Sequence, residues 1–97
     1  MRNVVVEVEY VSSLYIITGK KKEKIVLFNP KIHELMEELS KKYGHKSKEG
    51  SVLKFPQSYN HIYVYVNGKF LKYSEAPETT LMNEDKVTLI PAIVGGC

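Results

Sequence analysis

The chain contains one convincing amphipathic helix, and this limits the folds that it can adopt. Its apolar residues recur every three or four positions and form a single stripe: Ile32, Leu35, Met36, Leu39 and Tyr43. Asn29-Pro30 predicts the helix start, because Asn caps free N–H groups and Pro fits the first helical position. Gly44 predicts the end. The remaining segments with a regular pattern favour strands, so a single helix has to cover one face of a sheet.

Alternating or continuous apolar residues predict the strands of this sheet. In the first strand, one side of the alternation is apolar and the other carries Glu7 and Glu9, which is typical of a sheet with one wet face. Asn67-Gly68 predicts a tight hairpin turn, since both positions tolerate positive φ. Pro91 predicts the end of the last strand, because it donates no ladder hydrogen bond. The predicted strands are residues 4–10, 24–28, 61–66, 69–72 and 87–90.

Three segments between these elements are less regular. Residues 11–18 fit either a strand or a loop with a short helical turn, and the lysine-rich residues 20–24 predict a solvated turn. Residues 44–60 are polar, with two glycines and a proline, and predict a long loop. The connector after the second hairpin offers Leu81 as its core residue.

The order hairpin, helix, loop, hairpin and final strand predicts an α+β fold. Its first and last strands both bury valines, so the economical arrangement sets them side by side and parallel, as in a β-grasp sheet with one covering helix. The ferredoxin-like alternative needs a second helix that the sequence does not offer. We expect one β-grasp domain over residues 1–91 and a flexible tail over residues 92–97.

Composition excludes several classes of protein. The formal net charge of +3 is too small to indicate nucleic-acid binding by itself. No apolar run approaches the length of a membrane span, and the N-terminus lacks the layout of a signal peptide. A single cysteine excludes an internal disulfide, and we expect a cytoplasmic protein. The three histidines, His33, His45 and His61, match no short metal-ligand spacing, so we expect no metal site.

The end of the chain is the strongest functional signal. Gly95-Gly96 has no Cβ atoms, so it fits an extended path through a narrow channel, although two glycines at a chain end are by themselves a weak motif. The segment Leu89-Ile90-Pro91-Ala92-Ile93-Val94-Gly95-Gly96 resembles the ending of the ubiquitin-like sulfur carriers, such as the small subunit of molybdopterin synthase. Ala92 stands where those carriers have a second Pro, Val94 where they have a small residue, and Cys97 follows where they end.

The resemblance extends along most of the chain. Segments resembling the carriers include Glu9–Leu14, the helix at Ile32–Leu39, the turn Tyr65–Gly68 and the approach Glu84–Val87. The long loop resembles that of the eukaryotic ubiquitin-related modifier and the archaeal small modifiers. The resemblance implies a substrate with no catalytic side chains and no bound cofactor. Its Gly96 carboxylate would be adenylated with ATP by an activating enzyme, then converted to a thiocarboxylate for a sulfur-acceptor enzyme or joined to target-protein lysines.

Docking to the activating enzyme needs a surface close to the tail. We expect it to include Ile93, Val94 and the exposed strand face with Tyr63 and Tyr65, because interfaces favour aromatic anchors. The free protein is expected to be a monomer. The alternative is a β-grasp interaction module with an inert tail, such as a small nucleic-acid binder that stacks bases on the two tyrosines. Salt-dependent RNA binding would favour this alternative.

Cys97 leaves three interpretations open. It is a cap removed by a processing protease, an addition for chemical attachment, or a retained and exposed thiol. While Cys97 is attached, the carboxyl group of Gly96 is part of an amide and is not available for adenylation. We therefore expect Gly96-Cys97 to be a processing site.

Overall fold

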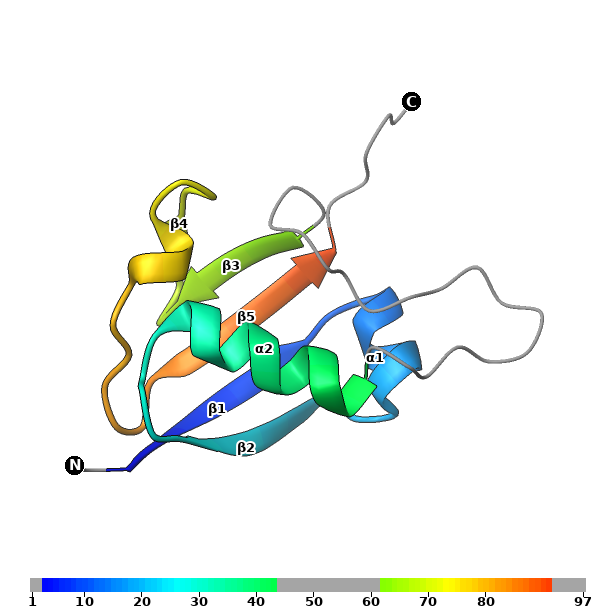
Figure 1. The fold of residues 1–97 in the computed structure, drawn as a ribbon. Helices are drawn as coiled ribbons and strands as arrows, with labels where there is room; N and C mark the ends of the chain where they lie inside the picture. Colours follow the sequence, from blue (N-terminus) through cyan, green and yellow to red (C-terminus); the bar gives the residue numbers. More distant parts are fainter. Residues whose placement is uncertain (1–2, 44–61, 92–97) are drawn as a thin grey trace.

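A parallel pair of strands, β1 (Val4–Tyr10) and β5 (Lys86–Pro91), lies at the centre of the fold. The computed structural model describes residues 3–43 and 62–91. Figure 1 shows a mixed sheet with the helix α2 (Ile32–Tyr43) lying across one face. The other elements are α1 (Ser13–Thr18), β2 (Lys22–Leu27), β3 (Ile62–Val66), β4 (Lys69–Leu71) and the 3-10 turn η2 (Ala76–Glu78).

The five strands lie in the order β2-β1-β5-β3-β4. β1 pairs antiparallel with β2 and parallel with β5, and β3 pairs antiparallel with both β5 and β4. This is the arrangement that the sequence predicts, a mixed α+β sheet of the β-grasp type. The parallel pair forms because both central strands bury apolar side chains against the same helix.

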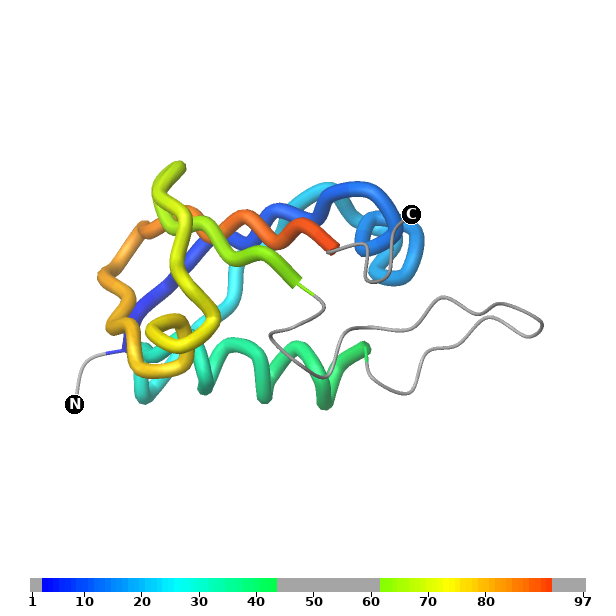
Figure 2. Tube along the Cα trace, turned by 90° about the horizontal axis from the view of Figure 1, so that it is seen from above, coloured from blue at the N-terminus to red at the C-terminus, as the bar shows by residue number. Residues whose placement is uncertain are grey.

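The core fills the space between the sheet and α2, which Figure 2 shows as two layers. Val6, Val8, Val87 and Leu89 are fully buried on the sheet side. Four residues of the predicted helix stripe are buried, namely Ile32, Leu35, Leu39 and Tyr43, and Met36 packs against them while partly buried. Leu81 is 1% exposed, as expected for the core residue of the connector.

The helix begins later than the sequence predicts, at Ile32 rather than at Asn29-Pro30. Backbone groups just before it bond to the connector instead. The Pro30 carbonyl accepts the N–H of Leu81, and Lys31 forms an isolated bridge with Thr80. The predicted Asn cap is therefore wrong, because a tertiary contact keeps this stretch out of the helix for two further residues.

Residues 13–18 form the helix α1, which resolves the ambiguity between strand and helical turn. The Thr18 hydroxyl donates to the Leu14 carbonyl at 2.9 Å, and Gly19 ends the helix with φ 75°. The predicted turn over residues 20–24 is wrong in part, because β2 begins at Lys22. The hairpin turn is confirmed, with φ of 51° at Asn67 and 84° at Gly68.

Candidate docking site

β5 leads directly to the C-terminal segment and is the middle strand of the sheet. It lies between β1 and β3, and its inward side chains Val87 and Leu89 are fully buried, as predicted. The segment between β1 and α1 adds a further support, since the Val11 N–H donates to the Leu89 carbonyl at 3.2 Å. Pro91, half-buried, is the last residue of β5 and lies opposite Ile62. β5 is therefore held by neighbouring strands on both sides.

The predicted tail, residues 92–97, lies outside the described residues. This applies to every site residue that we placed there: Ile93, Val94, Gly95, Gly96 and Cys97. Their roles, and the expected mobility of the tail, stay predictions.

An exposed group of aromatic rings lies on the sheet face opposite α2. Tyr63 and Phe70 are 46% and 47% exposed, and their ring centroids are 6.0 Å apart in an edge-on arrangement. Tyr65 is half-buried, with its ring centroid 5.5 Å from that of Phe70. We call Tyr63, Tyr65 and Phe70 the aromatic patch. Tyr63 lies directly opposite Ile90 of β5, so the patch adjoins the last residues of β5 before the C-terminal segment.

Tyr63 and Tyr65 lie on the outer face, as the alternation of β3 predicts, but our sequence analysis missed Phe70. The signal was present in the Asn67-Gly68 turn. A two-residue turn fixes the register of a hairpin, and this register sets Phe70 opposite Tyr65. Directly opposite residues project from the same face, so Phe70 had to join the two tyrosines.

Charged residues lie on the same face beside the patch, and their signs alternate across the strands. Lys24 of β2 lies opposite Glu7 of β1, which lies opposite Lys86 of β5. A second row contains Lys22, Glu9 and Thr88, and the Thr88 hydroxyl lies 3.3 Å from a carboxylate oxygen of Glu9. A surface of alternating sign next to an apolar patch is suited to a protein partner rather than to a phosphate backbone.

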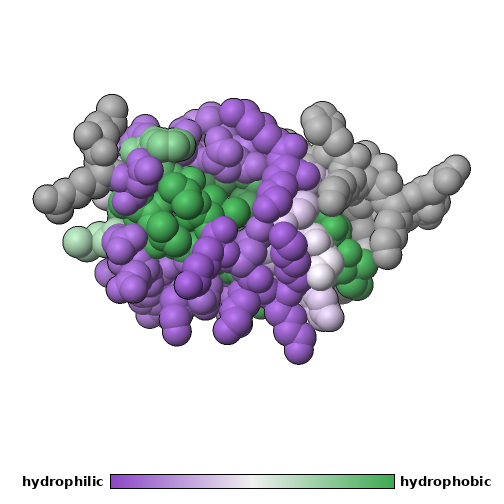
Figure 3. All heavy atoms as spheres, turned by 90° about the horizontal axis from the view of Figure 1, so that it is seen from below, coloured by the Kyte–Doolittle hydropathy of each residue, from purple (hydrophilic) through white to green (hydrophobic). Residues whose placement is uncertain are grey.

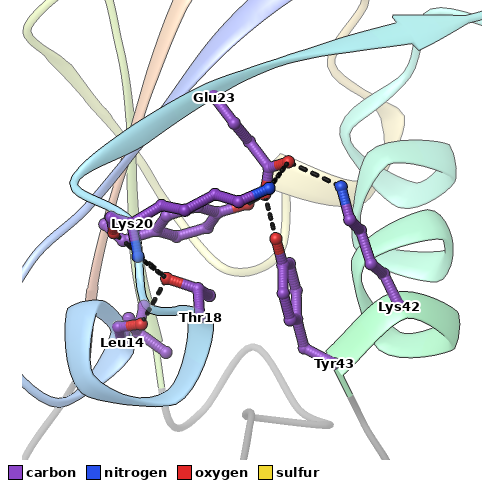
Figure 4. Close-up of polar contacts among 7 residues, drawn as sticks. Leu14, Thr18, Lys20, Glu23, Lys42 and Tyr43 are labelled. Carbon is purple, nitrogen blue, oxygen red and sulfur yellow. Dashed lines mark hydrogen bonds and ion pairs between the residues drawn. The ribbon is translucent and has the colours of Figure 1, made fainter.

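A second polar cluster holds the last turn of α2 against β1 and β2. The Glu23 carboxylate accepts hydrogen bonds from Tyr10 at 2.5 Å, Lys42 at 2.7 Å, Lys20 at 3.3 Å and the Tyr43 hydroxyl. Figure 4 shows Lys42 and Tyr43 of the helix pointing toward Glu23 of the strand. The Glu23 side chain is only 9% exposed. We call these five residues the Glu23 cluster.

Burial alone would raise the pKa of the Glu23 carboxyl. The hydrogen bonds from Lys42, Tyr10 and Tyr43 outweigh burial and hold the pKa at about 2. The same contacts act on the partners: burial and the bond to Glu23 raise the pKa of both tyrosine hydroxyls, and the bond to Glu23 raises the pKa of Lys42. Each group therefore keeps at neutral pH the charge that the cluster needs, which indicates a structural clamp rather than a proton-transfer site.

No group of three or more potential metal ligands occurs among residues 3–43 and 62–91. His33 is exposed on α2 and lies 2.9 Å from Glu37. No helix in the described ranges is long and apolar enough to cross a membrane.

Comparison with protein families shows that the model of the ThiS family matches residues 8–96. The match includes the end of β1, the helix α2, the strand β5 and both glycines. Comparison with curated proteins gives no significant match.

Solved structures with the same fold include an archaeal modifier protein, a subunit of a molybdopterin converting factor and a chain of a protein complex. The small archaeal modifier protein 1 of Methanosarcina acetivorans is 19% identical, with a TM-score of 0.70 over 99% of this chain and 100% of that one. A putative molybdopterin converting factor subunit 1 from Pyrococcus furiosus is 23% identical, with a TM-score of 0.69 over 93% and 99%. A chain of the BexX/CysO complex of Amycolatopsis orientalis is 23% identical, with a TM-score of 0.62 over 94% and 99%. At these identities the likeness establishes the fold.

Proposed function

Because the chain belongs to the ThiS family of ubiquitin-like sulfur carriers and modifiers, we propose that its Gly96 carboxylate is adenylated by an activating enzyme. The observation that carries the proposal is a family match that runs through both glycines and starts within β1. Carriers of this family are substrates of activating enzymes and are not enzymes themselves. The chain supplies a carboxylate, a way to present it and a docking face.

The chemistry begins when a carboxylate oxygen of Gly96 attacks the α-phosphate of ATP and pyrophosphate leaves. A persulfide of the sulfur-donor protein then attacks the carbonyl carbon of the acyl-adenylate, AMP leaves, and an acyl disulfide joins the two proteins. A thiol then attacks the donor's sulfur atom in this disulfide, which forms a new disulfide on the donor and releases the thiocarboxylate. Attack by a lysine amine instead gives an isopeptide and AMP. Both routes need an unblocked carboxylate, so we propose that Cys97 is removed first by a processing protease.

The described residues support this proposal through the position of β5. A strand held on both sides fixes the point at which the C-terminal segment leaves the domain. Gly95-Gly96 offers no side chains to a narrow channel. The aromatic patch lies beside the end of β5, where a surface bound at the mouth of the channel is needed. The BexX/CysO complex pairs a relative of this chain with another protein, and we propose a comparable docking here.

The proposal is tested by ATP–pyrophosphate exchange with the activating enzyme from the same cells, using the chain that ends at Gly96. We expect exchange that depends on both proteins, and an intact mass from those cells that corresponds to the Gly96 carboxylate or thiocarboxylate. The absence of exchange, together with an unprocessed and unmodified mass in the cell, would favour the interaction module with an inert tail.

Replacing Tyr65 by Ala is expected to lower kcat/KM for activation about tenfold, because loss of an aromatic anchor from an interface typically costs one to two kcal/mol. Val94→Asp should have a similar effect if the tail residue enters the same interface. The measurement is the rate of pyrophosphate exchange over a range of carrier concentrations. Tyr65 is half-buried, so the thermal unfolding of the variant is compared with that of the unmodified chain.

Phe28→Ala is the matched control, since Phe28 is 66% exposed but follows β2 at the opposite edge of the sheet. Its exchange rate should be unchanged. Equal rates for all three variants would show that the aromatic patch is not the docking surface, while leaving the chemistry at Gly96 intact.

A further inference from the structure

β2 forms an open edge of the sheet, at the opposite side from the aromatic patch. In the described part of the chain no strand lies beyond it. The Tyr10 N–H donates to the Lys21 carbonyl at 2.7 Å, and β2 continues antiparallel from there. Backbone groups alternate between the two sides of an antiparallel strand, so those of Glu23 and Ile25 face β1. The N–H and C=O groups of Lys22, Lys24 and Val26 consequently point outward.

The side chains along this edge fall into two kinds. Lys22 and Lys24 are exposed on the outer face and, among the described residues, form no ion pair. Val26 follows them on the same face and is 50% exposed, and Phe28 beyond it is 66% exposed. On the inner face, Ile25 is only partly buried beside the core. Figure 3, which views the molecule from the side of β2, shows hydrophobic atoms in two areas with hydrophilic atoms between them.

We propose that the outer edge of β2 is a second docking site, which adds an extended peptide as a further strand. The peptide carries acidic side chains opposite Lys22 and Lys24 and aliphatic side chains opposite Ile25 and Val26. Free backbone groups supply the affinity of such strand addition, and the alternate side chains supply the specificity.

The strand β1, which already pairs with β2, shows which side chains suit a strand beside β2. β1 sets Glu7 opposite Lys24, Glu9 opposite Lys22 and Val5 opposite Val26. Directly opposite side chains share a face whichever edge of β2 the neighbour occupies. An acidic residue opposite Lys24 on the open edge would also extend the row Lys24, Glu7, Lys86 with its signs still alternating.

Charge also decides against a second copy as the occupant. Pairing of two β2 edges would place the lysines of both copies on neighbouring strands. Like charges on neighbouring strands are destabilising. The opposite edge, β4, has only three residues and offers a shorter ladder. β2 is therefore selective for an acidic partner strand and disfavours self-association.

The probe is a synthetic amidated peptide with the sequence of β1, Val-Val-Val-Glu-Val-Glu-Tyr, titrated into the full chain and followed by NMR. We expect shifts centred on the amides of Lys22, Lys24 and Val26. Lys24→Glu should weaken binding about fivefold, as expected for a cross-strand charge pair of up to one kcal/mol. Lys72→Glu, an exposed lysine beyond β4, is the matched control and should leave the affinity within about twofold.

Peptides with N-methyl groups on alternate residues test the backbone pairing without altering the protein. One set of methyl groups faces β2 and should abolish binding, whereas the set that faces solvent should not. Equal binding of both sets, or of a peptide with lysines in place of its glutamates, would overturn the proposal. So would concentration-dependent dimerisation through β2, or shifts at Lys22 and Lys24 produced by single-stranded RNA and not by the peptide. None of these outcomes bears on activation at Gly96.

Discussion

The chain that ends at Gly96 is expected to support adenylation, whereas the forms that end at Cys97 and at Gly95 are expected to lose it by at least about a hundredfold. In the longer form, the carboxyl group of Gly96 is part of an amide, and the terminal α-carboxylate lies one residue further along and next to a side chain. In the shorter form, the carboxylate falls one residue short of the position that the enzyme requires. A displacement of about an ångström at a reacting centre is already enough to lose two orders of magnitude.

All three forms keep the described domain unchanged, so each serves as the folding control for the others. The measurement is ATP–pyrophosphate exchange with one activating enzyme. Adenylation of the 97-residue form at the rate of the Gly96 form would contradict processing and would favour the interpretation of Cys97 as a retained thiol. A rate that is insensitive to removal of Gly96 would contradict the assignment of the reactive carboxylate.

The central topology was predictable from the sequence because it depends on burial patterns. Strands 4–10 and 87–90 both present valines to one helix, and a side-by-side arrangement is the economical way to bury both. The Asn67-Gly68 turn was predictable for a local reason, since it needs two residues that tolerate positive φ.

Contacts between distant segments were not predictable from local patterns. The helix starts at Ile32 because the Pro30 carbonyl is bound to Leu81, some fifty residues away along the chain. The Glu23 cluster was missed because Glu23 lies among lysines and resembles part of a solvated turn. Its alternation with Ile25 and Leu27 was the available signal, since those side chains point to the core. The aromatic patch was found in part, because Phe70 joins it only through the hairpin register.

The Glu23 cluster is also the polar feature on which stability should depend most. A pKa held at about 2, against an ordinary value of 4.5, corresponds to about 3 kcal/mol of stabilisation at neutral pH. We expect Glu23→Gln to lower the free energy of unfolding by about that amount at pH 7. Glutamine keeps the size of the side chain but removes the charge to which two tyrosines and two lysines donate.

The pH dependence of the stability lost in Glu23→Gln identifies the cause of that loss. The folded-state pKa of Glu23 lies below its unfolded value, so its carboxylate stabilises the fold fully above about pH 4.5. That stability is lost as the pH falls toward 2. The difference between the unmodified chain and Glu23→Gln, measured by urea unfolding at a series of pH values, should therefore be constant near neutrality and shrink through this window. Glu37→Gln, a half-exposed carboxylate on the surface of α2, is the control and should change stability by less than about 0.5 kcal/mol. A Glu23→Gln effect that persists unchanged at pH 2 would mean that the loss comes from packing, because a protonated Glu23 has already lost the charge that the cluster binds.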